Sequence, residues 1–315
     1  MLENLRNGGR CVRNKVYSGI DNLPNGISSE EIVQGCLVLE GGAFRGVYEE
    51  GVLDAMLEAG INMQCTIGVS AGALNGMNYV AGQIGRSARV NLRYRHDHRY
   101  VGVRALRNNH GIIGFDFLFE GLKNIDSLNY ERFHRKEQRF IAVATNCKTG
   151  KTEYFEKGLC KDIFQAIRAS ATLPYISKMV DIDGTPYLDG GCSCRIAYQW
   201  ALNENFEKIV VVKTRDDSFR KPIKDKKIHR AKAFYHFYPE LAESLARSDE
   251  DYNRQCDEIE KLRREKRIFV ISPSKPVNVG RIEGDMEKLG KLYYLGYEDA
   301  KKQMKDLMDY LSINR

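Results

Sequence analysis

The stretch that decides the fold is Cys65-Thr66-Ile67-Gly68-Val69-Ser70-Ala71-Gly72-Ala73-Leu74-Asn75-Gly76-Met77. A short β-favouring run ends at Val69 and small, helix-compatible residues follow, so Ser70 is predicted to lie on a tight strand-to-helix turn. Gly68 and Gly72 flank the serine because such a turn brings backbone too close for a Cβ atom. The pattern is typical of a nucleophile elbow, which holds a serine in a strained conformation facing substrate.

A glycine-rich loop precedes the elbow. The apolar run Cys36–Glu40 predicts a buried parallel strand, the loop Gly41–Gly46 follows it, and a helical pattern then continues from Val47 until Gly60 ends it. Strand, loop, helix, strand, elbow and helix therefore follow one another. This order predicts an α/β fold with a parallel sheet.

The rest of the chain supplies further strands and helices. Continuous or alternating apolar runs predict strands at 139–145, 152–155, 179–182, 186–188, 209–212 and 268–271. Helical patterns cover 163–170, 239–267 and 283–311. Residues 1–35 are expected to form a loosely attached lead-in, and the lysine-rich segment 215–230 an exposed loop.

Bulk properties restrict the class of protein. The 315 residues are 43% hydrophobic and suffice for one large α/β domain, with or without a helical annex. No secretory signal is expected, since no apolar segment follows the charges of residues 1–10, and no run of 18 apolar residues occurs in the sequence. Eight scattered cysteines suit a reducing cytoplasm. The formal charge of +7 permits contact with an anionic membrane or nucleic acid and requires neither.

Two segments between the elbow and residue 120 have marked compositions. Residues 86–107 are rich in arginine, which we interpret as a solvated helix and loop rather than a phosphate-binding face. Residues 112–119 are aromatic and apolar, and are interpreted as a buried loop or as the lip of an active-site mouth.

Three loops are expected to converge. Gly41–Gly46, Ser70 and Asp189-Gly190-Gly191 each follow a predicted strand or hairpin, and loops at the carboxyl ends of parallel strands share one edge of a sheet. Backbone N–H groups in the glycine loop can stabilise a developing oxyanion. A dinucleotide-binding role is disfavoured, because the full Gly-x-Gly-x-x-Gly spacing and a following acidic residue are absent.

Four sequence blocks, at 40–46, 68–72, 169–174 and 189–191, resemble in this order the blocks of the patatin-like phospholipase family. Residues 238–241 and 290–300 are similar to its bacterial branch with a C-terminal extension. The resemblance implies a three-layer sandwich with a mostly parallel central sheet flanked by helices. Its expected parts are the lead-in 1–35, a catalytic core at 36–215 and a strand-containing helical extension at 216–315.

The family resemblance also implies a site. It implies a serine lipid acyl hydrolase in which Ser70 is the nucleophile and Asp189 the general base, without histidine, metal or cofactor. The oxyanion hole would be formed by Gly41, Gly42 and Ala43. Ala43 replaces a family glycine and keeps its N–H donor on the condition that its φ is negative. The supporting motif residues are Arg45, Gly46, Gly68, Gly72, Gly190 and Gly191.

Arg45 is expected to brace the loop or to meet an anionic group. An ordinary carboxylate, with a pKa of about 4, is a weak base for serine. The proton must therefore move in concert with attack, or burial must raise the pKa of Asp189.

The expected partner is a lipid or acyl ester; nucleic acid is not expected.

The same residues allow other interpretations. A Ser-Asp-His triad could use His229 or His236, which follow Asp189 in the chain. Cys192 and Cys194 could bind zinc, but without a second ligand pair nearby they are expected to be free thiols. A non-catalytic lipid- or nucleic-acid-binding protein on the same fold is the other class, and the presence of both Ser70 and Asp189 favours the enzyme.

Overall fold

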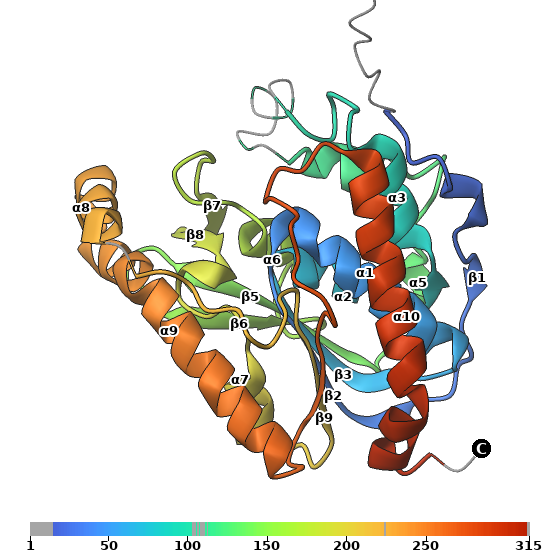
Figure 1. Cartoon of the computed structure of the whole chain (residues 1–315). Helices are drawn as coiled ribbons and strands as arrows, with labels where there is room; N and C mark the ends of the chain where they lie inside the picture. The colour runs from blue at the N-terminus through green and yellow to red at the C-terminus, as the bar shows by residue number, and fades with distance from the viewer. Residues whose placement is uncertain are drawn as a thin grey trace, which may run out of the picture.

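A computed structural model describes residues 15–102, 105, 107, 111, 113–223 and 225–313. Its centre is an eight-stranded sheet in the order β10-β9-β2-β3-β5-β8-β7, with β6 paired to β5 (Figure 1). The strands of this sheet are β2 (Val33–Leu39), β3 (Met63–Val69), β5 (Arg139–Asn146), β6 (Thr152–Glu156), β7 (Val180–Ile182), β8 (Thr185–Asp189), β9 (Ile209–Val212) and β10 (Phe269–Ile271). β10, β9, β2, β3 and β5 run parallel, and β6, β7 and β8 are joined by antiparallel pairings.

Helices cover both faces of the sheet. They are α1 (Val47–Glu58), α2 (Ala71–Val80), α3 (Arg86–Tyr94), α5 (Tyr130–Phe133), α6 (Ile163–Ser170), α7 (Tyr198–Asn203), α8 (Asp225–Phe234), α9 (Pro239–Arg264) and α10 (Met286–Leu311). Along β2, Leu37 and Leu39 pack into the core shared with α1, α2 and α10, whereas Cys36 and Val38 face α7 and α9. This alternation makes a three-layer α/β fold with a mostly parallel sheet, so the predicted fold class is confirmed.

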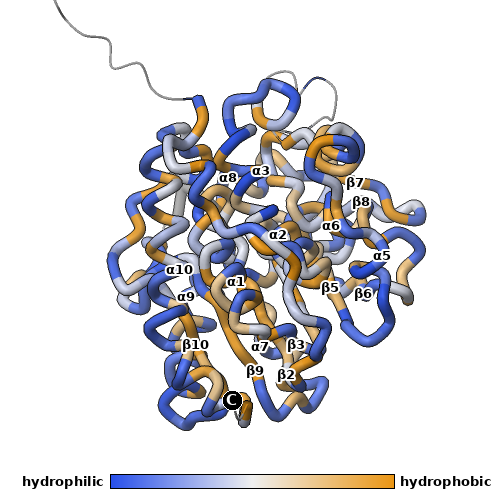
Figure 2. The backbone as a smooth tube through the Cα atoms, turned by 90° about the vertical axis from the view of Figure 1, so that its right-hand side faces the viewer, coloured by the Kyte–Doolittle hydropathy of each residue, from blue (hydrophilic) through white to orange (hydrophobic). Residues whose placement is uncertain are grey.

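Apolar residues are concentrated on the central strands, and polar residues on the outer loops (Figure 2). β9 shows why: its four residues Ile209–Val212 are buried on both faces of the sheet, as the continuous β-branched run predicts. None of the helices in the described part of the chain combines the length and apolar character that crossing a bilayer requires.

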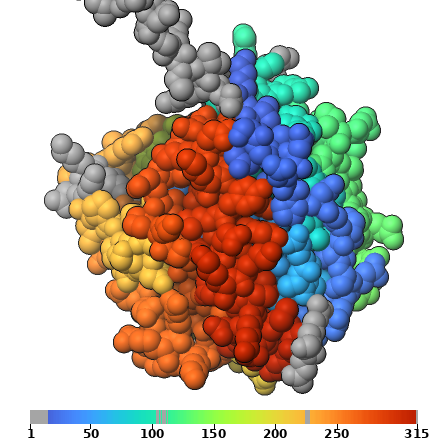
Figure 3. Space-filling model, turned by 45° about the vertical axis from the view of Figure 1, so that its right-hand side comes forward, coloured from blue at the N-terminus to red at the C-terminus, as the bar shows by residue number. Residues whose placement is uncertain are grey.

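The C-terminal segment is packed into the same body as the elbow. β10 extends the central sheet beside β9, and α10 crosses α1 at very close range. A Cβ atom on Gly296 would lie 1.9 Å from the carbonyl oxygen of Tyr48. The Tyr48 hydroxyl also donates a hydrogen bond to Asp299 (3.2 Å). On one face of the molecule α10 lies beside the N-terminal segment, where Ser18 donates to Glu287 (Figure 3).

Residues 15–35 differ from the loose lead-in expected there. Leu23 is buried, and β1 (Gly26–Ile27) pairs with β4 (Gln83–Ile84). The carbonyl oxygen of Ser28 accepts a hydrogen bond from the Arg132 guanidinium (2.8 Å). The expectation is wrong for these residues because partners distant in sequence hold them; residues 1–14 lie outside the described chain.

Two other expectations for polar segments are wrong in part. The loop expected over 215–230 ends in helix α8, because Ala231 and Tyr235 pack against Leu241 and Leu245 of α9. In the arginine-rich segment, Arg86 is buried rather than solvated. Its guanidinium donates to the Asn78 side chain and to the carbonyl oxygen of Asp126. Arg104 lies outside the described residues.

Candidate active site

Ser70 and Asp189 meet because two strands approach each other end to end. β3 runs parallel to β5, and its last residue, Val69, pairs with Val143. β8 runs antiparallel to β5, and Asp189 pairs with the next residue, Ala144. β6 pairs with β5 over the same residues and so occupies the opposite edge. The C-terminal ends of β3 and β8 therefore face each other.

The three predicted loops do converge, but for a partly different reason. Gly41–Gly46 and Ser70 follow parallel strands, as expected. The Asp-Gly-Gly loop follows an antiparallel strand, so the parallel-edge argument is wrong for it. The Asp-Gly-Gly loop still lies beside Ser70, because β5 continues past the end of β3. β8 pairs with this continuation in the opposite direction and so ends where β3 ends.

The turn at Ser70 is strained in the way that an elbow requires. Ser70 has φ 58° and ψ −120°, which is unfavourable for a residue with a side chain. A Cβ atom on Gly68 would lie 2.3 Å from the carbonyl oxygen of Gly72, and one on Gly72 would lie 2.7 Å from that of Leu39. Both flanking glycines are therefore required by close backbone contact, as the sequence indicates.

The two polar side chains are directly bonded. Ser70 Oγ donates a hydrogen bond to Asp189 Oδ2 at 2.6 Å, and the Gly191 N–H donates to Asp189 Oδ1 at 2.7 Å. Ser70 is 6% exposed and Asp189 is 5% exposed. Burial raises the pKa of Asp189 above its usual value, against the opposing effect of the Ser70 and Gly191 hydrogen bonds. The carboxylate is thus both oriented and made more basic.

The segment from Ser170 to Thr172 is hydrogen-bonded to the backbone of both Ser70 and Asp189, a role that the sequence did not suggest. Its Oγ accepts a hydrogen bond from the backbone N–H of Ser70 at 2.9 Å, and its side chain is fully buried. Two residues later, the carbonyl oxygen of Thr172 accepts from the N–H of Asp189 at 2.9 Å. The only sequence signal was that both residues belong to the third motif block, 169–174.

The glycine loop lies against the elbow. A Cβ atom on Gly41 would lie 2.8 Å from the Cβ of Ser70, so the two segments are in van der Waals contact. The N–H groups of Gly42 and Ala43 donate to no atom of the described residues. Ala43 opens the short 3-10 turn η2 (Ala43–Gly46) that leads into α1. Two free N–H donors thus lie at a helix start close to Ser70.

The condition placed on Ala43 is not met. Its φ is +49°, in the left-handed region, where an L-residue with a Cβ is strained and glycine is not. This chain therefore holds the loop in a conformation that costs energy for alanine and would not for glycine. Ala43 still carries a backbone N–H, so the positive φ changes the strain at this residue and not the presence of the donor.

Other motif residues are placed by tight packing. A Cβ atom on Gly190 would lie 2.3 Å from the carbonyl oxygen of Val143, and one on Gly46 would lie 2.9 Å from the Cβ of Ala71. Arg45 is buried, and its Nε donates to no atom of the described residues. Burial, with a smaller effect of Arg215, lowers the pKa of Arg45 to about 10. Arg45 therefore retains an unsatisfied donor beside the glycine loop.

Two cavities meet at Ser70. We call the first the narrow pocket; Phe44, Leu74, Met77, Val90, Ile113 and Leu118 form its apolar walls. We call the second the wide groove; Asp189, Arg195, Arg230, Asp249 and Arg281 are its charged residues, together with Arg45. The groove measures about 420 Å³ and the pocket about 70 Å³. Since Ser70 lines both, a bond at its hydroxyl would separate an apolar part from a polar part of a ligand.

Neither histidine of the alternative triad lines a cavity at Ser70. No histidine is among the described residues that line either cavity, and His229 and His236 are exposed on or next to α8. Within the described chain, no three His, Cys, Asp or Glu side chains are grouped as a metal would need. Cys192 and Cys194 are free thiols. His110 and Cys11 lie outside the described residues.

The fold and the site thus define an α/β protein with a strained serine hydrogen-bonded to a buried aspartate. Comparison with family models matches residues 37–198 to the patatin-like phospholipases and residues 238–312 to a domain of unknown function, DUF6363. The chain belongs to the patatin-like phospholipase family. Membership indicates a hydrolase that acts on lipid esters.

Individual relatives are distant. The uncharacterized protein YjjU of Escherichia coli K12 is 27% identical over 266 residues, which are 82% of this chain and 74% of that protein. Lysophospholipase nte1 of Aspergillus terreus is 29% identical over 160 residues, 49% of this chain but only 10% of that protein. VipD of Legionella pneumophila aligns in structure with a TM-score of 0.48 and 13% identity, over 90% of this chain and 70% of that one.

Proposed function

We propose that this protein is a serine lipid acyl hydrolase that uses Ser70 and Asp189 as a dyad, without a histidine. The observation that carries the proposal is the hydrogen bond of 2.6 Å from Ser70 Oγ to a buried aspartate. Asp189 replaces the usual histidine base, and its raised pKa makes it better matched to that task than an exposed carboxylate.

In the proposed reaction, Asp189 Oδ2 accepts the hydroxyl proton as Ser70 Oγ attacks the ester carbonyl carbon. The negative charge moves to the carbonyl oxygen, where the free N–H groups of Gly42 and Ala43 would donate to it. The tetrahedral intermediate expels the alcohol, which takes the proton back from Asp189. Water then attacks the acyl-enzyme carbonyl carbon while Asp189 accepts its proton. When this second tetrahedral intermediate collapses, Ser70 Oγ leaves and takes that proton from Asp189, and the fatty acid is released.

The two cavities suggest how the substrate lies. The apolar walls of the narrow pocket suit an acyl chain, whereas the arginines of the wide groove suit a phosphate-bearing leaving group. Arg281 makes no side-chain hydrogen bond or ion pair with a described residue, and it lines both cavities. The ester bond would then be presented to Ser70 at the junction of the cavities.

The proposal is tested by labelling with a fluorophosphonate probe and by hydrolysis of p-nitrophenyl esters. Wild-type protein should be labelled, and Ser70→Ala should not. Asp189→Asn should lower kcat by about 10² or more, the usual contribution of a general base. The double variant His229→Ala, His236→Ala serves as the control and should hydrolyse esters at the wild-type rate. Loss in the histidine variant equal to that of Asp189→Asn would support a triad and refute the dyad.

A further inference from the structure

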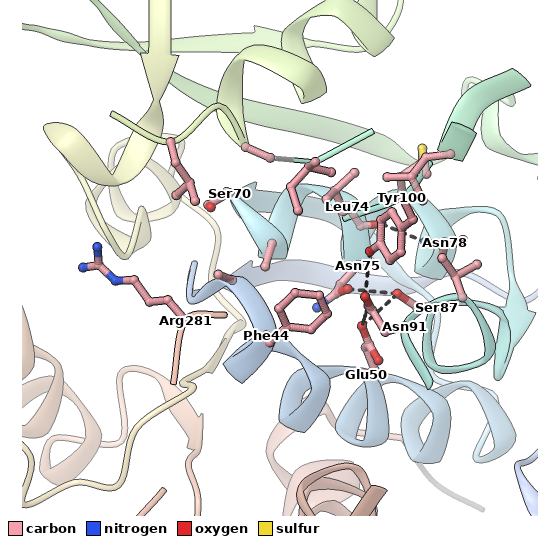
Figure 4. Close-up of a pocket in the computed structure, with 18 of the residues that line it drawn as sticks. Phe44, Glu50, Ser70, Leu74, Asn75, Asn78, Ser87, Asn91, Tyr100 and Arg281 are labelled. Atoms are coloured by element: carbon pink, nitrogen blue, oxygen red, sulfur yellow. Dashed lines mark hydrogen bonds between the residues drawn. The ribbon is translucent and has the colours of Figure 1, made fainter. Parts of the chain in front are cut away.

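The narrow pocket has apolar walls but ends at polar side chains. It starts at Ser70 and follows one face of α2, formed by Ala71, Leu74, Asn75 and Asn78. Figure 4 shows Ser70 at one end, Phe44 and Leu74 along the way, and a cluster of polar side chains at the other end. At 1.5 Å per helical residue, the polar positions on α2 lie about 6 to 10 Å beyond Ala71.

The polar cluster is a connected network; we call it the polar end. Its members are Glu50, Asn75, Ser87, Asn91 and Tyr100. Asn91 Nδ2 donates to Glu50 Oε1 at 2.5 Å, and the Tyr100 hydroxyl donates to Asn91 Oδ1 at 2.6 Å. Ser87 Oγ lies 2.9 Å from Asn75 Oδ1 and 3.3 Å from Glu50 Oε1 (Figure 4). These contacts fix the orientation of groups drawn from α1, α2, α3 and the segment after α3.

The polar end carries little net charge. Burial raises the pKa of Glu50 to about 8, which outweighs the hydrogen bond from Asn91, so its carboxyl group is mostly protonated at neutral pH. The nearby Arg86 guanidinium is already directed to Asn78 and to the Asp126 carbonyl oxygen. A neutral hydrogen-bonding group therefore fits this end better than an ionised one.

Hydrogen-bonding capacity remains unused there. The amide of Asn91 has two N–H donors, and only one of them has a partner among the described residues. The Tyr100 hydroxyl donates once, and no group among the described residues donates to its oxygen. The second N–H of Asn91 can donate a hydrogen bond to a ligand hydroxyl group, and the Tyr100 oxygen can accept one from the same hydroxyl group. The hydrogen bond from Tyr100 to Asn91 keeps these two groups next to each other.

We propose that the polar end binds a hydroxyl group on the distal part of the acyl chain, so that the preferred substrates are esters of medium-length hydroxylated fatty acids. The inference rests on the proposed function, since Ser70 sets the position of the ester carbonyl. A plain hydrocarbon end placed here would cover the Asn91 and Tyr100 groups without bonding them, which is unfavourable.

Binding can be measured apart from catalysis. In the Ser70→Ala variant, titration calorimetry with methyl ω-hydroxyoctanoate should give an affinity about tenfold tighter than with methyl octanoate. In wild-type protein, kcat/KM for the p-nitrophenyl ω-hydroxyoctanoate should exceed that for the octanoate by a similar factor.

Variants assign the preference to named groups. Asn91→Leu should remove the preference for the hydroxylated ester or reverse it. Tyr100→Phe, which deletes one hydroxyl and keeps the ring packed against Phe117, should reduce it severalfold and decides the matter if Asn91→Leu fails to fold. Asn203→Leu, an exposed substitution at the end of α7, is the matched control and should leave the ratio unchanged.

The outcomes separate the two proposals. Equal or weaker binding of the hydroxylated ester, or a preference that survives both Asn91→Leu and Tyr100→Phe, would overturn the role of the polar end and leave the dyad intact. Preferential binding by Ser70→Ala, together with no turnover by the wild-type protein, would support the polar end and overturn the proposed hydrolase.

Discussion

Ser70 Oγ donates a hydrogen bond to Asp189 Oδ2. The bond joins the ends of two strands, β3 and β8, which face each other along β5. Asp189 is the last residue of β8, and Ser70 lies directly between β3 and α2. The Gly191 N–H donates a hydrogen bond to Asp189, and the Ser170 hydroxyl oxygen accepts one from the N–H of Ser70. The pair is therefore a preorganised element of the sheet, and its chemistry should respond sharply to changes in these contacts.

The first prediction concerns pH. Because burial raises the pKa of Asp189, and only the ionised carboxylate can accept the serine proton, kcat/KM should rise with pH along an acid limb. The midpoint should lie above 3.9, which is about the value of an ordinary aspartate. Asp183→Asn, at an exposed turn, should leave the limb unchanged. If the residual activity of Asp189→Asn keeps the same limb, another group controls it.

The second prediction concerns Ser170. Ser170→Ala leaves the buried N–H of Ser70 without its acceptor, which should lower the free energy of unfolding by about 1 to 3 kcal/mol. The elbow should also shift, with a loss of about tenfold in kcat and little change in KM. Ser28→Ala removes another buried hydroxyl, one bonded to Asn62, and should lower stability without lowering kcat. Equal kcat in the two variants would rule out a positioning role for Ser170.

The third prediction concerns Ala43. Its φ of +49° costs about 1 to 2 kcal/mol for a residue with a Cβ, whereas glycine adopts this conformation freely. Replacing Ala43 by glycine removes this strain, but the greater entropy of glycine in the unfolded chain offsets about 0.4 to 1 kcal/mol of the stabilisation. Ala43→Gly should therefore stabilise the protein by about 0.5 to 1 kcal/mol in urea unfolding and keep near-normal activity, since the N–H remains. Ala43→Val should destabilise it, and a loss of stability in Ala43→Gly would contradict the strain.

The fourth prediction concerns the contact of α10 with α1. Gly296→Ala places a Cβ atom against the carbonyl oxygen of Tyr48, and the two helices must move apart. The free energy of unfolding should fall by about 2 kcal/mol, which is within the range typical of overpacking. Gly280→Ala, at a position with nothing within 4 Å of the added atom, is the control and should change stability by less than about 0.5 kcal/mol. Similar stabilities would show that the crossing is not tightly packed.

Much of the architecture could be predicted locally. The strands β2, β3, β5 and β9 coincide with apolar runs, and the elbow coincides with glycines whose Cβ atoms would clash. Such features depend on residues close in sequence, which is why a single chain indicates them. The helix α8 was missed because packing against α9, rather than its own pattern, stabilises it.

The sequence by itself determined the nucleophile turn, the glycine loop and the alternation of strands and helices, because these follow from local sterics and periodicity. Only the tertiary structure decided that β8 runs against β5 to bring Asp189 to Ser70, that Ser170 binds the elbow, and that Ala43 has a positive φ. It also decided that α1, α2 and α3 close the narrow pocket with a polar end. Register, burial and cavity shape arise from contacts between distant segments, and no local pattern of residues encodes them.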